Sequence, residues 1–300
     1  MQDDPSLPVL STSGLKWLGV GISGMVYPLD EQTVVKIAPK CDNDYASNES
    51  LQDLQIERSV YRHLGSHPRI CRFISSVQRG IVLERFGEPL RKHLLELHKQ
   101  RKTPSRNQAL KWSIQVAEGV AYLHQKNIMQ GDIGCHNILL KDDEIKLCDF
   151  GGSSIDGKPA EVGYECRSQR WDDTHENPSI QNELFALGST IYEIWTTTRP
   201  YQDEPDEKVE QNYKCQCFPD VQTLPVAKVI QNCWHGTYHS ANEVVAALES
   251  LQPERMRPYE STDANNRTML ATFASIITVF ILAAWFEPGE VVATMRNSWF

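Results

Sequence analysis

Hydrophobic and polar positions change their spacing once along the chain. In the opening part, short apolar runs alternate with polar residues, a pattern typical of half-buried strands. It predicts strands up to about Ala38 and over residues 69–76 and 79–84, with an amphipathic helix over residues 45–64 between them. Beyond Gly87 apolar residues recur every three or four positions, which predicts helices. These helices are expected over residues 89–99, 104–126, 181–197, 221–234 and 240–251.

One short strand pair interrupts the helical part, over residues 138–140 and 145–148. Its strands are joined by the acidic turn Lys141-Asp142-Asp143-Glu144, and aspartates favour tight turns. A β-rich half followed by a mainly helical half indicates an α+β protein. We therefore predict a bilobal α+β fold, with a small β-rich N-lobe over residues 15–84 and a larger helical C-lobe over residues 88–251.

Glycines cluster at the first predicted hairpin. Gly19, Gly21 and Gly24 have the spacing G-x-G-x-x-G and are followed by Val26. This string alone is a weak signal, because it also opens dinucleotide-binding domains. In those domains a long helix follows the glycines, whereas here a strand, a turn at residues 30–32 and another strand are expected. A glycine-rich hairpin lets backbone N–H groups approach phosphates closely, so we interpret it as a phosphate-binding loop. The alternative is a hairpin that is merely flexible.

A lysine and a glutamate stand at positions where the pattern is apolar. Lys36 shares one face of its predicted strand with Val34 and Ala38, and a buried ammonium group needs an anionic partner. On the following helix Glu57 falls within the apolar stripe. A buried carboxylate is costly unless it is paired with a cation. We therefore predict an ion pair between Lys36 and Glu57.

Two polar strings flank the strand pair of the helical part. Asp132 and Asn137 precede it with the spacing D-x-x-x-x-N, and Asp149-Phe150-Gly151 follows it directly. Together with the glycine loop and the lysine–glutamate pair upstream, these strings resemble the eukaryotic protein kinase family along nearly all of residues 15–251. The abbreviated form of the pattern is similar to that of divergent, fungal-type kinase domains. The resemblance implies the same two-lobed fold that the apolar pattern predicts.

The resemblance also implies a role for each of these residues. Lys36 and Asp132 would be catalytic, with Asp132 as the base that accepts the proton of the substrate hydroxyl. ATP would bind under the glycine loop, and Asn137 and Asp149 would hold Mg²⁺. The hinge that binds adenine between the lobes is matched by Leu83, Glu84 and Phe86. The expected function is transfer of the ATP γ-phosphate to a protein hydroxyl, of serine or threonine rather than tyrosine.

The chain departs from the family pattern at several places. Gln130-Gly131 stands where the family has His-Arg, so we expect no ordinary phosphorylation switch in the activation loop. Gly134 replaces a lysine near the transferred phosphate, which predicts slow turnover. The closing Ala-Pro-Glu is not recognisable in residues 164–171. His136 either supplies part of the missing positive charge or only packs the loop.

These departures leave two alternatives to an active protein kinase. One is a pseudokinase, a module that binds ATP or a partner with little or no turnover. The other is a small-molecule phosphotransferase, which the string from Gly131 to Asn137 suggests. The Asp149-Phe150-Gly151 triplet and the helix expected over residues 181–197 disfavour this second alternative, because both resemble protein kinases specifically.

Charge and cysteine content narrow the class of protein. The chain has 30 Lys and Arg against 39 Asp and Glu, a net charge of −9, which argues against a surface built for nucleic acid. Its eight cysteines show no spacing typical of zinc ligands, so we expect reduced thiols. The opening residues lack the basic and then apolar pattern of a signal peptide. We therefore expect a kinase domain in the cytoplasm with a protein substrate.

The two ends of the chain lie outside the predicted kinase domain, with residues 1–14 as an N-terminal tail and 252–267 as a polar linker. Residues 268–286 carry no charge and would reach roughly 28 Å as a helix, close to the ~30 Å core of a bilayer. More arginines precede this span than follow it, which favours the kinase side as cytoplasmic. We predict a transmembrane helix there, followed by a tail over residues 287–300; the alternative is a packed C-terminal helix.

Overall fold

The computed structural model describes residues 4–21, 23–40, 44–158, 160, 162–171 and 178–252. The transmembrane helix predicted over residues 268–286 and the tail after it lie outside these ranges. Within the described ranges, no helix is both long enough and apolar enough to cross a bilayer. Membrane attachment therefore stays a prediction from the sequence.

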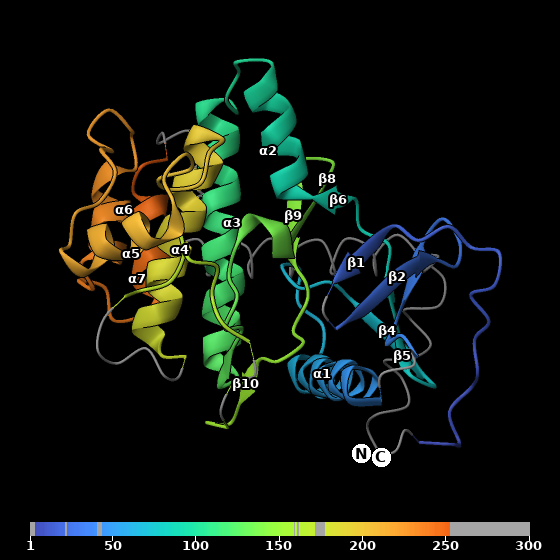
Figure 1. The fold of residues 1–300 in the computed structure, drawn as a ribbon. Coiled ribbons are helices and arrows are strands. Elements are labelled where there is room, and N and C mark those ends of the chain that lie inside the picture. The colour runs from blue at the N-terminus through green and yellow to red at the C-terminus, as the bar shows by residue number, and fades with distance from the viewer. Residues whose placement is uncertain are drawn as a thin grey trace, which may run out of the picture. The chain divides into compact units, whose positions relative to one another are not determined.

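A five-stranded antiparallel sheet and one long helix make up the first lobe (Figure 1). The strands are β1 (Gly19–Gly21), β2 (Gly24–Pro28), β3 (Thr33–Ile37), β4 (Phe73–Val77) and β5 (Gly80–Glu84). They lie in the order β1-β2-β3-β5-β4, so that β3 pairs with both β2 and β5. The helix α1 (Asp44–Leu64) connects β3 to β4 and contacts β4 and β5.

The two faces of β3 are buried against different partners, because successive side chains of a strand point to opposite sides. Val34 and Ala38 belong to the main hydrophobic core, which includes α1 and continues into the helical lobe. Val35 lies in a smaller cluster on the other face, where Leu10 of the N-terminal segment covers it. Lys36 shares the face of Val34 and Ala38 and is therefore directed toward α1.

The helix α1 turns one stripe of side chains toward this core. Leu54, Glu57, Tyr61 and Leu64 are three or four residues apart, and each is at most 2% exposed. Residues at this spacing share one face of a helix, as the apolar pattern predicted. Glu57 is a charged residue in this stripe, and it is buried together with the apolar side chains beside it.

The second lobe is mainly helical in the described part of the chain. Its helices are α2 (Leu90–Lys99), α3 (Arg106–Gln125), α4 (Ile180–Thr196), α5 (Asp206–Lys214), α6 (Ala227–Trp234) and α7 (Ala241–Glu249). At its centre α3 contacts α4, while α7 packs on α3 and α6 packs on α4 (Figure 1). Serine side chains cap the N-termini of both central helices. Ser105 accepts a hydrogen bond from Gln108 N at α3, and Ser179 accepts one from Asn182 N at α4.

Short strands lie where the second lobe meets the first. They are β6 (Glu88–Pro89), β7 (Ile128–Met129), β8 (Ile138–Lys141), β9 (Glu144–Leu147) and β10 (Ser154–Ile155). The β8–β9 hairpin turns through Asp142 and Asp143, whose φ angles of 50° and 65° are those a two-residue hairpin turn requires. Just beyond the pairing of β8 with β9, Cys148 N donates to Asn137 O at 2.9 Å. The hairpin therefore brings the two polar strings that flank it to the same end.

The structure confirms the bilobal α+β architecture and corrects two details of the helical part. The apolar pattern missed α5, because only Val209 and Tyr213 of this short polar helix are buried. The helix expected over residues 221–234 begins only at Ala227. Pro225 explains the later start, since a proline disfavours helical geometry in the residue before it.

Candidate active site

Three charged side chains from distant parts of the chain meet at β3. Lys36 Nζ lies 2.7 Å from Glu57 Oε2 on α1 and 2.8 Å from Asp149 Oδ1, just after β9. The side chains of Lys36 and Glu57 are 5% and 1% exposed, whereas that of Asp149 is 37% exposed. The predicted pairing of Lys36 with Glu57 is thus present, and Asp149 extends it toward solvent.

The electrostatics of this cluster keep the lysine charged. Burial opposes the ammonium form, but the charges of Asp149 and Glu57 outweigh burial and raise the pKa of Lys36. Burial likewise opposes ionisation of Asp149, yet the ammonium group of Lys36 lowers the pKa of this carboxyl below its ordinary value. A charged ammonium group and a partly exposed carboxylate therefore lie side by side at the end of β9.

The residues around Asp149 fix its position. Asp149 itself has a left-handed backbone (φ 59°), which places its side chain differently from those of the strand before it. Phe150 is fully buried and meets the ring of Tyr61 on α1 edge-on at 5.1 Å. The N–H of Phe150 also donates to Glu57 Oε1 at 3.4 Å. The helix that supplies Glu57 thus also anchors the segment that supplies Asp149.

The glycine loop lies against this same segment. A Cβ on Gly21 would lie 3.9 Å from Asp149 Oδ2, and one on Gly151 would lie 3.0 Å from the side chain of Ser23. Gly24, with φ 159°, has no room for a side chain, because its Cβ would lie 2.8 Å from Ile37 O. The hairpin of β1 and β2 therefore runs close to the partly exposed carboxylate, where phosphates would need backbone donors.

The predicted hinge connects β5 to β6. Leu83 is 7% exposed and belongs to the main core, while Glu84 and Phe86 are half-buried. The Glu84 carboxylate accepts from Arg72 N at 2.6 Å and pairs with Lys146 on β9, whose ammonium group lies 4.7 Å from the centre of the Phe86 ring. These contacts tie the connection between the lobes to both lobes.

The candidate base stands in the loop before β8. Asp132 Oδ2 accepts hydrogen bonds from Asn137 Nδ2 and from His136 Nε2, each at 2.9 Å. Asn137 Nδ2 also donates to Asp132 O at 2.9 Å. Since its amide nitrogen is used within the loop, the Asn137 amide oxygen is left for another partner.

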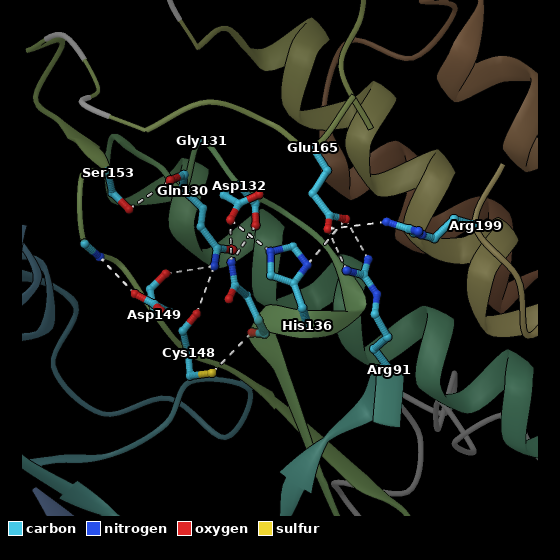
Figure 2. A network of polar contacts seen from close by, with 12 residues as sticks. Arg91, Gln130, Gly131, Asp132, His136, Cys148, Asp149, Ser153, Glu165 and Arg199 are labelled. Atoms are coloured by element: carbon cyan, nitrogen blue, oxygen red, sulfur yellow. Dashed lines mark hydrogen bonds and ion pairs between the residues drawn. The ribbon is translucent and has the colours of Figure 1, made fainter. Parts of the chain in front are cut away.

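Gln130 joins this loop to the segment of Asp149. Its side-chain Nε2 donates to Cys148 O at 2.9 Å and to Asp149 O at 3.2 Å (Figure 2). In the second lobe, the buried Glu183 on α4 accepts from Gln130 N at 3.1 Å and from Gly131 N at 3.0 Å. The candidate base Asp132 and the carboxylate of Asp149 are thus held to each other and to the central helix.

A cluster of charges near the candidate base was not predicted from the sequence. Arg91 on α2 forms a two-pronged ion pair with Glu165, both contacts at 2.7 Å (Figure 2). Arg91 also pairs with Glu193 on α4 at 2.8 Å. Arg199 Nη1 lies 3.9 Å from Glu165 Oε1. Glu193 gave a signal, because a carboxylate in the middle of an apolar helix requires a cation. The sequence held no indication that Arg91 would be that cation.

The segment after Gly163 is therefore anchored without an Ala-Pro-Glu string. Tyr164 donates to Glu183 Oε1 at 2.7 Å, and Glu165 is held by Arg91. Arg167 is 8% exposed and pairs with Asp206 at the start of α5 at 2.5 Å. Ionic and hydrogen-bonded contacts thus fix residues 164–167 to the second lobe.

The donor set fits Mg²⁺, which prefers few protein oxygen ligands and keeps several waters. Asp149 Oδ2 and Asn137 Oδ1 accept no hydrogen bond from the described residues. The other polar atom of each side chain is bonded, since Asp149 Oδ1 accepts from Lys36 and Asn137 Nδ2 donates to Asp132. No cluster of three or more acidic, histidine or cysteine ligands occurs in the described ranges. A magnesium ion that bridges protein and phosphates needs no such cluster.

A cavity of about 700 Å³ lies away from this site. Its lining includes His124 at the end of α3, Asp156 and Lys158 after β10, and Ile180 at the start of α4. None of the site residues predicted from the sequence lines it. The candidate chemistry is therefore assigned from the convergent polar groups and not from this cavity.

A known protein family matches the part of the chain that carries these polar groups. The protein kinase domain family matches residues 13–257, which include every predicted site residue. The chain belongs to this family. The kinase domain seen here has the β-sheet lobe, the helical lobe and the order of polar groups that the resemblance implied.

Similar kinases differ in the hydroxyl that their names specify. A melanoma receptor tyrosine-protein kinase of Xiphophorus maculatus is 26% identical over 72% of this chain and 20% of its own length. The mitogen-activated protein kinase kinase kinase dlk-1 of Caenorhabditis elegans is 28% identical over 65% and 21%. The serine/threonine-protein kinase plk-1 of the same organism is 25% identical over 72% and 35%. The chain thus spans between 20% and 35% of the length of these relatives.

Proposed function

We propose that this kinase domain transfers the γ-phosphoryl group of Mg-ATP to a hydroxyl group of a protein. The observation that supports it best is the charged cluster at β3, where Lys36 contacts both Glu57 and Asp149. Burying a lysine and a glutamate is costly, and a fold needs neither for stability alone. A cluster that remains partly exposed at Asp149 is suited to a ligand with phosphates and a metal ion.

Each residue has a role that follows from its chemistry. Lys36 would contact the phosphates of ATP, with Glu57 holding its ammonium group in place. Backbone N–H groups of the loop from Gly19 to Gly24 would cover the phosphates. Asn137 and Asp149 would hold Mg²⁺, which when bound neutralises charge on the phosphates. Adenine would lie at the hinge beside Leu83.

The transfer itself needs one proton acceptor. The oxygen of the substrate hydroxyl forms a bond to the γ-phosphorus while the bond from that phosphorus to the bridging oxygen of ADP breaks. The hydroxyl proton passes to Asp132, and ADP leaves. Alignment of the two reactants supplies much of the rate, so the hydrogen bonds that fix Asp132 are part of the machinery.

The acceptor hydroxyl is proposed to be that of serine or threonine, in a kinase domain over residues 15–251. A pseudokinase is the second candidate, and two observations favour it. Gly134 leaves a position near the base without a side chain, and Gln130-Gly131 offers no cation to a phosphorylated activation loop. We expect transfer that is slow but measurable, since the groups that bind ATP are all present.

The test measures nucleotide binding and phosphoryl transfer separately. The full chain is expected to show an ATP-dependent thermal shift that requires Mg²⁺ and is lost in Lys36→Met. Lys92→Met is the matched control, because Lys92 is 67% exposed on α2. Transfer to peptides that Asp149→Ala abolishes would support the kinase. Binding without transfer to any peptide would support the pseudokinase, and transfer to small molecules alone would contradict both.

A further inference from the structure

His136 stands between two carboxylates beside the candidate base. Its Nε2 lies 2.9 Å from Asp132 Oδ2, and its Nδ1 lies 3.6 Å from Glu165 Oε2 (Figure 2). Because a carboxylate oxygen only accepts, Nε2 carries the proton of the first contact. The side chains of His136 and Asp132 are 27% and 22% exposed, so both are partly open to solvent.

Both donors to the Asp132 carboxylate use the same oxygen. His136 Nε2 and Asn137 Nδ2 each lie 2.9 Å from Oδ2, while no donor among the described residues contacts Oδ1. Two hydrogen bonds to one oxygen fix the rotation of the carboxylate and leave the other oxygen with its lone pairs free. Oδ1 is therefore the oxygen available to a substrate hydroxyl.

Gly134 provides the room in which the imidazole ring lies. A Cβ on Gly134 would be 2.6 Å from Cε1 and 2.7 Å from Nδ1 of His136, distances that side-chain atoms do not tolerate. The backbone of Gly134 is extended (φ −176°), which any residue can adopt. The glycine is therefore explained by space and not by backbone conformation.

A carboxylate also faces the Nδ1 edge of the ring. Glu165 faces Nδ1, and its carboxylate is held by the two-pronged pair with Arg91. Arg91 is held in turn by Glu193 of the central helix α4. The charged and titratable groups around His136 are thus Asp132, Glu165 and Arg91, with Asp149 close enough to interact with its charge.

We propose that His136 is a positioning residue for Asp132, and that Gly134 is the position that admits its ring. The proposal rests on the proposed phosphoryl transfer and deepens it. His136 holds Asp132 so that Oδ1 faces the substrate hydroxyl, and a side chain at position 134 displaces the ring that does so. The role depends on a hydrogen bond donated by Nε2, so a side chain with a donor at the same reach can replace the imidazole.

The first measurement compares three variants of the full chain in a peptide phosphorylation assay. His136→Ala is expected to lower kcat by about 10- to 10²-fold, since a base misplaced by about 1 Å loses rate on that scale. The Kd for Mg-ATP is expected to stay at the wild-type value. The His136 side chain contacts Asp132 and Glu165, and neither of these residues is proposed to bind ATP or Mg²⁺. His136→Gln retains a donor and should recover most of the kcat. His98→Ala is the matched control, a histidine on α2 whose ring meets Thr197.

The second measurement tests whether Gly134 acts through His136. Gly134→Ala alone should lower kcat about as much as His136→Ala, because the new Cβ pushes the ring aside. In the double variant the two losses should not multiply, since nothing remains for the methyl group to displace. In an Asp132→Asn background, His136→Ala should cause no further loss. A fall in thermal stability alone would produce none of these dependences.

The outcomes separate this inference from the proposed function. An active wild-type protein in which His136→Ala retains its kcat overturns the role of His136 and leaves phosphoryl transfer standing. Losses that multiply fully in the Gly134→Ala, His136→Ala double variant overturn the role of Gly134. A wild-type protein that binds Mg-ATP and transfers no phosphate overturns the proposed function, and the role of His136 falls with it.

Discussion

Glu183 offers the clearest test of how the catalytic loop is held. Its carboxylate is fully buried on α4 and accepts from Gln130 N at 3.1 Å, from Gly131 N at 3.0 Å and from the Tyr164 hydroxyl at 2.7 Å. The substitution Glu183→Ala leaves these three donors without their acceptor. Gln130 is 1% exposed and Gly131 is buried, so water does not readily replace the lost carboxylate.

The magnitude follows from counting those donors. A buried donor that loses its acceptor costs about 1–3 kcal/mol, so two backbone N–H groups and one hydroxyl together cost about 3–9 kcal/mol. For a protein of this size, that corresponds to a fall of about 6–36 °C in the melting temperature. Because Gly131 precedes Asp132, the loosened loop also misplaces the base, and kcat should fall about 10²-fold.

The assay is urea and thermal denaturation of the full chain, with two comparisons. Glu249→Ala, an exposed glutamate at the end of α7, should leave stability within about 0.5 kcal/mol of the wild type. Tyr164→Phe should cost about 1 kcal/mol alone and nothing in the Glu183→Ala background, where its hydroxyl already lacks this partner. A Glu183→Ala protein within about 1 kcal/mol of the wild type would refute the reasoning.

Three further predictions concern other parts of the chain. Gly87→Ala should lower the free energy of unfolding in urea by about 2–4 kcal/mol, because the φ of Gly87 is 52° and a Cβ there would lie 1.8 Å from Leu140 O. In the control Gly163→Ala the new Cβ would meet nothing within 4 Å, so its stability should be near that of the wild type. Equal losses in the two variants would contradict the steric argument. Burial raises the pKa of the Cys71 thiol to about 12, so iodoacetamide followed by mass spectrometry should find the exposed Cys215 and Cys217 alkylated well before Cys71; equal rates would be the contrary result. Deleting residues 268–300 should move the chain from the membrane to the soluble fraction of cells, and a full-length chain found wholly in the soluble fraction would refute the predicted transmembrane helix.

The sequence predicted those features that depend on local spacing. The stripe of α1 and the two faces of β3 followed from periods of 3.6 and 2, and they required that Lys36 and Glu57 meet. The turn at Asp142 and Asp143 followed from residue types that accept a left-handed backbone. A buried charge in such a pattern demands a partner, and Glu57 was the carboxylate of this helix that falls within the apolar stripe.

Contacts between segments that are far apart in the sequence could not be predicted in this way. Arg91, Glu165 and Glu193 come from three separate parts of the fold, and no period in the sequence relates them. The absence of Ala-Pro-Glu was visible, but the contacts that replace it were not. The role of Gly134 was also hidden, because it depends on where the ring of His136 lies and not on any property of glycine in the sequence.

Gln130 links the loop that carries Asp132 to the segment that carries Asp149 through a side chain that does not titrate. Its amide donates to the carbonyl oxygens of Cys148 and Asp149, at the place where the family pattern has a histidine. An imidazole gains a proton near neutral pH, whereas a carboxamide has no proton to gain or lose between about pH 2 and 12. The position of Asp132 relative to Asp149 is therefore insensitive to protonation of the residue at position 130, and a Gln130→His exchange would introduce that sensitivity.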